Sequence, residues 1–276
     1  GTASYTCQVP AGSPPGLLGL NLLHPELGFA GTAYIDLVTP ETKAAFAAAA
    51  AKVAAAGEHW LFLGDSLTDF LRGYNYVDQV NYWLQRTHGP GFTVRNAGVG
   101  GDYITRVWQR LNGEKTVHRL SMYEALYEPK PARVFIFLGH NDSKQSSASN
   151  FVQPLVAPAD FELQYRQSIA KLKADTGASI TLLSSTSSVF EICQANAERT
   201  RAAGRPASLF GRPEMLEQFN AIAQRVAQET GAGYIDVYEP TRTHPDKPTL
   251  FTADGVHLTL LGNHLVALRI LESLAR

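Results

Sequence analysis

Two short clusters of glycine and polar residues contain the groups that acyl transfer requires. Residues 64–68 (Gly-Asp-Ser-Leu-Thr) offer the Ser66 hydroxyl as a nucleophile. Residues 254–258 (Asp-Gly-Val-His-Leu) offer the His257 imidazole, which can take the hydroxyl proton, and the Asp254 carboxylate, which can orient the imidazole. Asp254 and His257 are three residues apart, so one turn places both side chains on the same side. The sequence therefore predicts ester hydrolysis by these three residues, with no metal or cofactor.

Acyl transfer also needs N–H donors for the oxyanion, and two further clusters supply them. Residues 96–102 end in Gly-Gly-Asp, and Gly101 has no side chain to keep its backbone N–H away from a ligand. Residues 139–142 (Gly-His-Asn-Asp) offer the side-chain amide of Asn141. Ser66, placed at the start of a helix, would leave its own N–H free. These three groups would together form an oxyanion hole.

Each of these residues also has a purely structural interpretation. A serine after a strand is a common helix N-cap, and Asn141 followed by Asp142 is a common turn dipeptide. Asp254 could cap the last helix, a role that is compatible with catalysis. All four clusters are expected at the same rim of the predicted sheet. Their occurrence together favours the catalytic interpretation for Ser66 and Asn141.

The position of each cluster after an apolar run predicts where it lies in the fold. The runs are nearly continuous rather than alternating, as in strands buried on both faces. Segments with helical spacing separate them, which predicts a three-layer α/β/α fold around a parallel five-stranded sheet. In such folds ligands bind beyond the carboxyl ends of the strands, where the clusters would meet. The predicted strands are residues 60–63, 92–94, 133–138, 179–183 and 234–237, and the predicted helices are residues 76–85, 104–111, 161–174, 213–230 and 262–274.

The sequence pattern of residues 1–57 differs from that of the rest of the chain. This difference predicts an N-terminal extension packed on a catalytic domain of residues 58–276. The extension contains a strand-like stretch at residues 32–38. An Ala-rich helix follows, with Thr39 as its N-cap and Gly57 as its stop.

Two long segments, residues 185–212 and 239–254, are predicted to be loops at the same rim of the sheet. One interpretation is ordinary surface. The other is a wall of the substrate pocket, because long loops in compact domains are often binding loops.

The four clusters, taken in order, resemble the sequence blocks of the SGNH or GDSL-like hydrolases over roughly residues 57–276. The resemblance implies a flavodoxin-like α/β/α fold and an esterase or lipase activity. It also implies that the N–H groups of Ser66 and Gly101 and the amide of Asn141 form the oxyanion hole. The residues that carry it are 64–67, 100–102, 139–142 and 254–257.

The Gly-His-Asn-Asp form of the third cluster resembles rhamnogalacturonan acetylesterase-like members of that family, so carbohydrate esters are the favoured substrates. His140 and Asp65 are the candidate substrate-binding residues. The leading hypothesis is removal of acetyl groups from a small-molecule or polysaccharide ester, and the alternative is a lysophospholipase or short-chain arylesterase. A catalytically inactive glycan-binding module is a third hypothesis, and the intact nucleophile, base and oxyanion residues argue against it.

Composition narrows the partners and the class of protein. The chain has 276 residues, of which 45% are hydrophobic and 18% charged, enough apolar material for one sizeable core. Its formal net charge is -1 and it has no long run of Lys or Arg, so we expect no nucleic-acid partner. No stretch approaches the ~18 apolar residues of a membrane span. The sequence makes no prediction about the oligomeric state.

The two cysteines, Cys7 and Cys193, leave two interpretations open. They could form one disulfide in an oxidising compartment, or they could be two unrelated thiols. The disulfide interpretation favours export, so a secreted or periplasmic location is expected.

Overall fold

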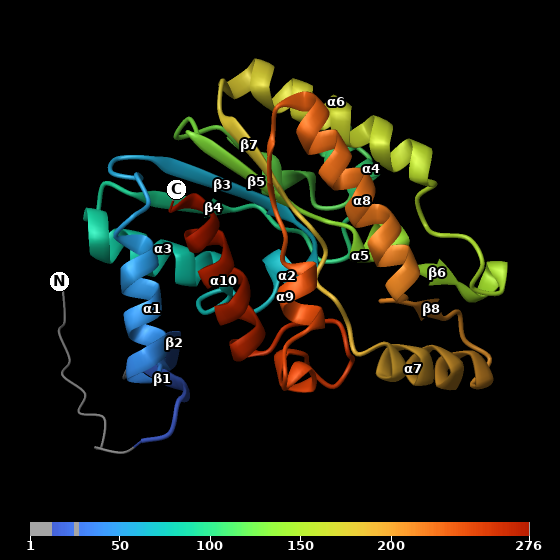
Figure 1. The fold of residues 1–276 in the computed structure, drawn as a ribbon, viewed down its shortest axis with the longest axis horizontal. Helices are drawn as coiled ribbons and strands as arrows, with labels where there is room; N and C mark the ends of the chain where they lie inside the picture. The colour runs from blue at the N-terminus through green and yellow to red at the C-terminus, as the bar shows by residue number, and fades with distance from the viewer. Residues whose placement is uncertain (1–12, 25–27, 276) are drawn as a thin grey trace.

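The centre of the fold is a parallel sheet, and the computed structural model describes residues 13–24 and 28–275. The sheet has five strands in the order β4-β3-β5-β7-β9 (Figure 1), and all neighbouring strands are parallel. The predicted α/β class and sheet are therefore confirmed. The strands are β3 (His59–Gly64), β4 (Thr93–Asn96), β5 (Arg133–Phe137), β7 (Ser179–Leu183) and β9 (Gly233–Ile235).

The strands read as continuous apolar runs because both faces of the sheet are covered. Alternate residues of a strand point to opposite faces. In β3, Trp60 and Phe62 belong to one core cluster, whereas Leu61 and Leu63 belong to the other. Every residue of β3 is buried, as expected for a strand between two helical layers.

Helices form the two outer layers and pack on one another within each layer. The layer on the Trp60 side consists of α1 (Pro40–Ala50), α3 (Tyr76–His88) and α10 (Leu260–Leu274). The layer on the Leu61 side consists of α4 (Ile104–Leu111), α6 (Pro158–Thr176) and α8 (Pro213–Thr230). All five predicted helices are present, and α4 and α8 have the predicted bounds.

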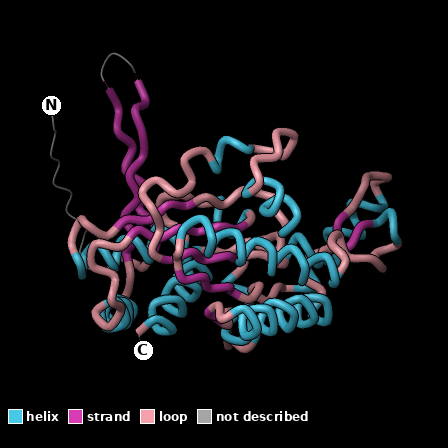
Figure 2. Tube along the Cα trace, turned by 90° about the horizontal axis from the view of Figure 1, so that it is seen from above, coloured by secondary structure: helices cyan, strands magenta, loops and turns pink. Residues whose placement is uncertain are grey.

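The N-terminal part contains a hairpin of which only the second strand was predicted. Strand β1 (Gly16–His24) pairs antiparallel with β2 (Gly28–Leu37), which contains most of the expected strand at residues 32–38. The hairpin projects from the body (Figure 2). Helix α1 follows it, and the Thr39 side chain caps this helix as predicted, accepting from the N–H of Thr42.

Helix α1 ends at Ala50, well before Gly57, so its predicted length was wrong. The N–H groups of Lys52 and Val53 bond the carbonyl groups three residues earlier, which tightens the last turn and ends the helix. Val53 is then buried in the core.

The two long segments predicted as loops contain regular structure. Residues 185–212 include α7 (Phe190–Ala202) and β8 (Ser208–Leu209), which pairs with β6 (Gln145–Ser146). Residues 239–254 include most of α9 (Tyr238–Arg242) and the 3-10 helix η3 (Lys247–Leu250). Helix α7 was not predicted because it buries only two side chains, those of Cys193 and Ala197, and so lacks a periodic apolar pattern. The remaining short helices are α2 (Ser66–Asp69), α5 (His140–Ser143), η1 (Leu120–Tyr123) and η2 (Ser147–Ser149).

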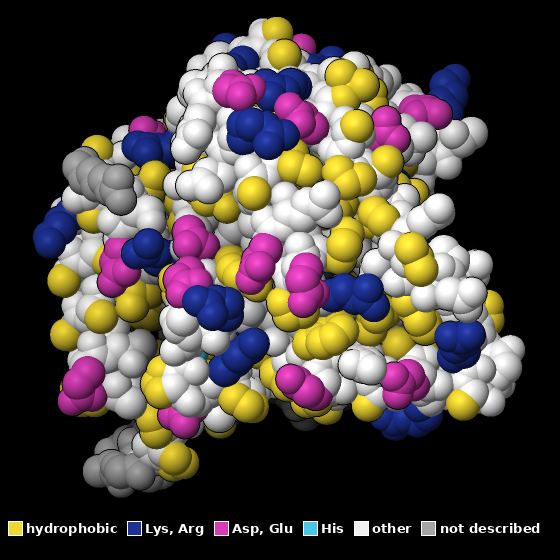
Figure 3. All heavy atoms as spheres, turned by 45° about the vertical axis from the view of Figure 1, so that its right-hand side comes forward, with side chains coloured by type: hydrophobic (Ala, Val, Ile, Leu, Met, Phe, Trp, Pro, Cys, Tyr) yellow, Lys and Arg dark blue, Asp and Glu magenta, His cyan; other side chains and the backbone are white. Residues whose placement is uncertain are grey.

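The length and apolar character of the helices bear on membrane insertion, and the distribution of charged side chains on the surface bears on nucleic-acid binding. In the described part of the chain, no helix is both long enough and apolar enough to cross a bilayer. On the side that carries α6, α7 and α8, Lys and Arg side chains are interspersed with Asp and Glu (Figure 3). The absence of a nucleic-acid partner stays a prediction.

Candidate active site

The carboxyl ends of β3 and β5 bring the predicted residues together. Ser66 is the first residue of α2, directly beyond β3. Its Oγ lies 2.8 Å from Nε2 of His257, and Nδ1 of the same ring lies 2.5 Å from Oδ2 of Asp254. A carboxylate accepts only, so Nδ1 carries the proton and the lone pair of Nε2 faces the hydroxyl. This geometry suits proton transfer from Ser66 to His257.

The Asp254 carboxylate is fixed by its own turn. Its Oδ1 accepts from the backbone N–H groups of Val256, at 2.8 Å, and His257, at 2.9 Å. Partial burial raises the pKa of Asp254, but the hydrogen bonds from the His257 ring and from these N–H groups outweigh burial and hold the pKa well below its ordinary value. Asp254 therefore remains ionised across the range in which proteins fold, and it can stabilise an imidazolium.

Phe70 orients the imidazole from the other side, a role that the sequence did not reveal. Its ring stacks on that of His257 at a centroid distance of 5.0 Å and an interplanar angle of 25°. Phe70 is half exposed and directly follows α2. A lone phenylalanine after the nucleophile cluster carries no signal of this contact, because the partner is far away in the sequence.

The loop that contains Gly101 is held by hydrogen bonds on both sides. Gly100 donates its N–H to Oδ2 of Asp69 at 2.9 Å, and the fully buried Asp102 carboxylate pairs with the guanidinium of Arg110. Between them Gly101 has a φ of +79°, a conformation that side chains other than glycine rarely adopt. An added Cβ would have its nearest neighbouring atom 4.0 Å away, so there is space for a side chain at this position. The backbone conformation, and not crowding, therefore requires the glycine.

The Asn141 amide has a defined orientation because its two neighbours are opposite in kind. Nζ of Lys144 lies 3.1 Å from Oδ1, and Oδ2 of Asp65 lies 3.3 Å from Nδ2. An ammonium group only donates and a carboxylate only accepts, so Nδ2 must be the donor atom. One N–H of Nδ2 is used by Asp65, and the oxyanion role predicted for the second stays a prediction. Lys144, one helical turn after Asn141, is a residue that its spacing could have suggested.

Two carboxyl groups are buried beneath these donors. Burial raises the pKa of Asp65 to about 6, against the opposing hydrogen bond from the Leu67 N–H. Burial also raises the pKa of Asp142 to about 7, and the nearby Asp65 carboxylate adds to the shift. Asp65 is 1% exposed, and its role as a substrate-binding residue stays a prediction. In the structure it caps α2 and contacts the Asn141 amide.

His140 lines the same site but is almost completely buried. Nε2 lies 3.0 Å from Oγ1 of Thr186, and Nδ1 has no partner among the described residues. Burial, with the nearby His257, lowers the pKa of His140 to about 4, so the ring is neutral. His140 stays a candidate substrate-binding residue because it lines the site, although its Nδ1 is buried.

A cavity of about 420 Å³, here named the Ser66 cavity, joins these groups. Ser66, Gly101, Asn141 and His257 all line it. Helix α7, in the segment expected to be a loop, forms one wall. The wall and rim residues are Cys193, Asn196, Ala197, Thr200, Ser208 and Phe210.

Cys193 is a free, buried cysteine in this structure. Its Sγ lies 3.6 Å from the carbonyl oxygen of Asp254, so it supports the turn that carries the carboxylate. Burial raises the pKa of the thiol to about 11, which leaves it protonated. Cys7, the suggested disulfide partner, lies outside the described residues.

Residues 62–265 match the model of the GDSL-like Lipase/Acylhydrolase family. No curated protein sequence matches the chain. Within the described residues, no group of three or more His, Cys, Asp or Glu side chains could hold a metal ion.

Several solved structures share the fold at low identity. A lipase/acylhydrolase from Enterococcus faecalis has a TM-score of 0.57 at 21% identity, covering 79% of this chain and 95% of its own. LAE5, a hydrolase from the Lake Arreo metagenome, has a TM-score of 0.58 at 21% identity, covering 80% and 96%. Axe2, an acetylxylan esterase from Geobacillus stearothermophilus, has a TM-score of 0.56 at 21% identity, covering 80% and 95%.

Proposed function

Because the chain belongs to the GDSL-like lipase/acylhydrolase family, we propose that it removes acetyl or other short acyl groups from a carbohydrate through an acyl-enzyme on Ser66. Membership makes it a carboxylic ester hydrolase, and the proposal concerns its substrate and its residues. One observation carries the proposal: the hydrogen-bonded series Ser66, His257 and Asp254 opens into the same cavity as Gly101 and Asn141.

The proposed acylation step begins when Oγ of Ser66 attacks the ester carbonyl carbon and its proton passes to Nε2 of His257. The ionised Asp254 stabilises the imidazolium. The carbonyl oxygen becomes an oxyanion, which accepts from the N–H groups of Ser66 and Gly101 and from Nδ2 of Asn141.

In the second half of the reaction the carbon–oxygen bond to the alcohol breaks, and His257 returns its proton to the departing alkoxide. A water molecule then attacks the acyl-enzyme, and His257 takes a proton from it. As the bond between the acyl group and Ser66 breaks, His257 returns this proton to Oγ of Ser66 and the carboxylic acid leaves.

The surface of the Ser66 cavity is mostly apolar, and the few polar side chains within it support a polar alcohol portion. Thr200, Ser208 and Asn196 carry hydroxyl and amide groups and line the same cavity as Ser66. Such groups match the hydroxyls of a sugar. The acetylxylan esterase among the similar structures supports an acetyl ester. If the substrate is an extracellular polysaccharide, a secreted or periplasmic location follows, and we keep it as part of the proposal.

A lysophospholipase or short-chain arylesterase is the second candidate. A smaller cavity of about 310 Å³ adjoins Ser66 and His257 and is lined by the apolar side chains of Phe70, Leu71 and Leu258. A longer acyl chain could occupy it.

A substrate panel tests the proposal against this candidate. We expect higher kcat/KM for p-nitrophenyl acetate than for the octanoate, and release of acetate from acetylated xylan or pectin. Mass spectrometry of the quenched reaction should find an acetyl group on the Ser66 peptide. A higher kcat/KM for the octanoate would favour the lipase interpretation.

A further inference from the structure

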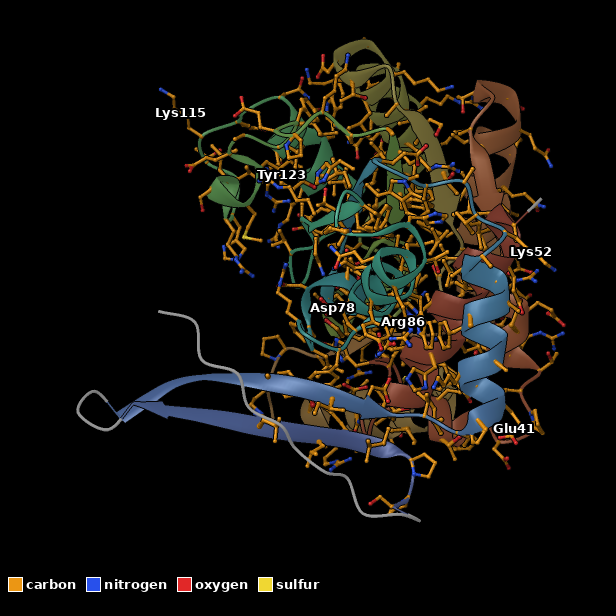
Figure 4. All side chains as sticks on the ribbon, turned by 90° about the vertical axis from the view of Figure 1, so that its left-hand side faces the viewer. Glu41, Lys52, Asp78, Arg86, Lys115 and Tyr123 are labelled. Atoms are coloured by element: carbon orange, nitrogen blue, oxygen red, sulfur yellow. The ribbon has the colours of Figure 1, made fainter. Side chains whose placement is uncertain are left out.

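A second cavity lies between the N-terminal hairpin and helix α3. Its volume is about 610 Å³, larger than the Ser66 cavity, and we name it the hairpin cavity. Strand β2 contributes Tyr34 and Asp36, and helix α3 contributes Gln79, Tyr82 and Trp83. Figure 4 shows the hairpin leaving the body below α3, on which Asp78 is labelled. The hairpin precedes residue 62, so one wall of this cavity lies outside the family match.

Four aromatic side chains line the hairpin cavity. The rings of Tyr34 and Tyr74 are 4.7 Å apart and tilted by 56°, and those of Tyr82 and Trp83 are 5.2 Å apart and nearly perpendicular. Tyr34 is 41% exposed and Tyr82 is 53% exposed, so ring surface is available to a ligand. Exposed aromatic rings beside polar groups suit the apolar C–H faces and the hydroxyls of a sugar ring.

The hydrogen-bonding capacity of the cavity is only partly used. Oδ2 of Asp36 accepts from the Gln79 amide at 2.8 Å and from His264, whereas Oδ1 is buried without a partner among the described residues. The indole N–H of the buried Trp83 also lacks a partner there. A buried polar atom without a partner is unfavourable. Both residues line the cavity, and a sugar hydroxyl that reached these atoms would donate to the carboxylate oxygen or accept from the indole N–H.

The charged side chains that line the hairpin cavity distinguish between acidic and neutral glycans. Asp36 and Asp78 line the cavity, and Lys43 is the one cationic side chain among its described lining residues. A ligand with many carboxylates would therefore be repelled, and a neutral glycan fits better.

A single short segment connects the two cavities. Phe70 lines the Ser66 cavity, Leu71 lines the adjoining apolar cavity, and Gly73 and Tyr74 line the hairpin cavity. A polymer that lies along residues 70–74 would therefore reach both.

We propose that the hairpin cavity binds sugar units of a neutral glycan whose ester group occupies the Ser66 cavity. This inference rests on the proposed function for the identity of the polymer. It gives the N-terminal hairpin a role in holding the polymer, away from the chemical step.

The binding test uses unacetylated xylohexaose, which has no ester to hydrolyse, and follows its titration into the full-length protein by calorimetry. Saturable binding is expected, and Tyr82→Ala should weaken it about tenfold, as the loss of one aromatic contact of ~1.4 kcal/mol would. Leu163→Ala, which removes an exposed apolar side chain from α6, is the control and should bind like wild type. Tyr34→Ala repeats the test from the hairpin side.

Three results would overturn the inference. They are an absence of saturable xylohexaose binding, affinity that neither tyrosine substitution changes, and tighter binding of hexagalacturonate than of xylohexaose. Circular dichroism establishes that each variant is folded.

A kinetic arm separates failure of this inference from failure of the proposed function. Tyr82→Ala should raise KM for acetylated xylan and leave kcat, and turnover of p-nitrophenyl acetate, unchanged. An equal loss on both substrates would contradict a role in holding polymer. Wild-type protein that binds xylohexaose but hydrolyses no acetyl ester would contradict the proposed function alone.

Discussion

The Ser66 cavity and the hairpin cavity differ in how their polar groups are held. In the Ser66 cavity, the proposed catalytic side chains are each fixed by neighbours: His257 by Asp254 and Phe70, and Asn141 by Asp65 and Lys144. In the second, aromatic rings are exposed and polar atoms are left without partners. Fixed dipoles serve a transition state, because they need no reorganisation during reaction. Unused hydrogen-bonding groups serve a ligand that supplies the missing partners.

The largest expected effect is that of Ser66→Ala, which should lower kcat for p-nitrophenyl acetate by about 10⁴-fold or more because the acyl-enzyme cannot form. The fold should remain, since the hydroxyl packs against little, and xylohexaose binding should persist. Steady-state kinetics and calorimetry on the same preparation measure both. Turnover near that of wild type would show that another residue is the nucleophile.

The body that holds this nucleophile could be predicted from the sequence because its signals are local. Strand β3 is a continuous apolar run, and the clusters after β3 and β5 contain the residues that meet. Helix α8 has strong apolar spacing, and Pro213 marks its start as Gly231 marks its end.

The remaining features depend on contacts between distant residues. Helix α7 buries little on its own, so it lacks a periodic signal, and β1 is a Leu-rich run whose partner is specified only by pairing with β2. The burial of Asp65 beneath Asn141 joins clusters 76 residues apart. No spacing rule in one sequence shows such contacts.

The second largest effect is expected for Asn141→Ala, which removes one proposed oxyanion donor. Losing such a donor typically costs about 10²- to 10³-fold in kcat, with KM within a few-fold, because the interaction strengthens in the transition state. Steady-state kinetics on p-nitrophenyl acetate measures both constants.

Asn141→Asp sharpens the test, because a carboxylate accepts where the oxyanion needs a donor, and the loss should be at least as large. If folded Asn141→Ala keeps more than about a third of kcat, the oxyanion hole is built elsewhere.

A smaller loss, about tenfold in kcat, is expected for Lys144→Met, corresponding to ~1.4 kcal/mol. The ammonium group holds Oδ1 of Asn141, and without it the amide can rotate away from the oxyanion. Methionine retains an unbranched stem against Phe210, over whose ring Nζ lies. Lys171→Met, on α6, is the control for loss of a positive charge. Equal activity in both variants would show that Asn141 needs no such support.

Asp65→Asn removes a buried charge, so it should change how stability depends on pH. Stability is followed rather than turnover, because the carboxylate also contacts the Asn141 amide. In the folded protein the pKa of Asp65 is raised to about 6, and in the unfolded chain the carboxyl has its ordinary, lower value. The folded state therefore holds a proton that the unfolded state releases, so wild-type stability falls as pH rises from about 4 to about 6. Asp142, with a pKa of about 7, extends this loss toward neutrality.

Asparagine retains the N-cap oxygen for Leu67 and has no charge to bury. Relative to wild type, the variant should gain roughly 1 to 3 kcal/mol between pH 4.5 and pH 8. Urea denaturation at several pH values measures the difference. A constant difference between the two proteins across this range would contradict the raised pKa.

The smallest effect on chemistry is expected for Asp36→Ala, in the hairpin cavity. Asp36 joins β2 to the body through Gln79 of α3 and His264 of α10, so its loss should loosen the hairpin without reaching Ser66. Hydrogen exchange of the β2 amides should quicken about tenfold, corresponding to a lost contact of ~1.4 kcal/mol. Turnover of p-nitrophenyl acetate should stay within about twofold, because distant sites act independently. If turnover falls as far as in Lys144→Met, the segment at residues 70–74 couples the cavities mechanically, and the hairpin supports the chemical site as well as the polymer.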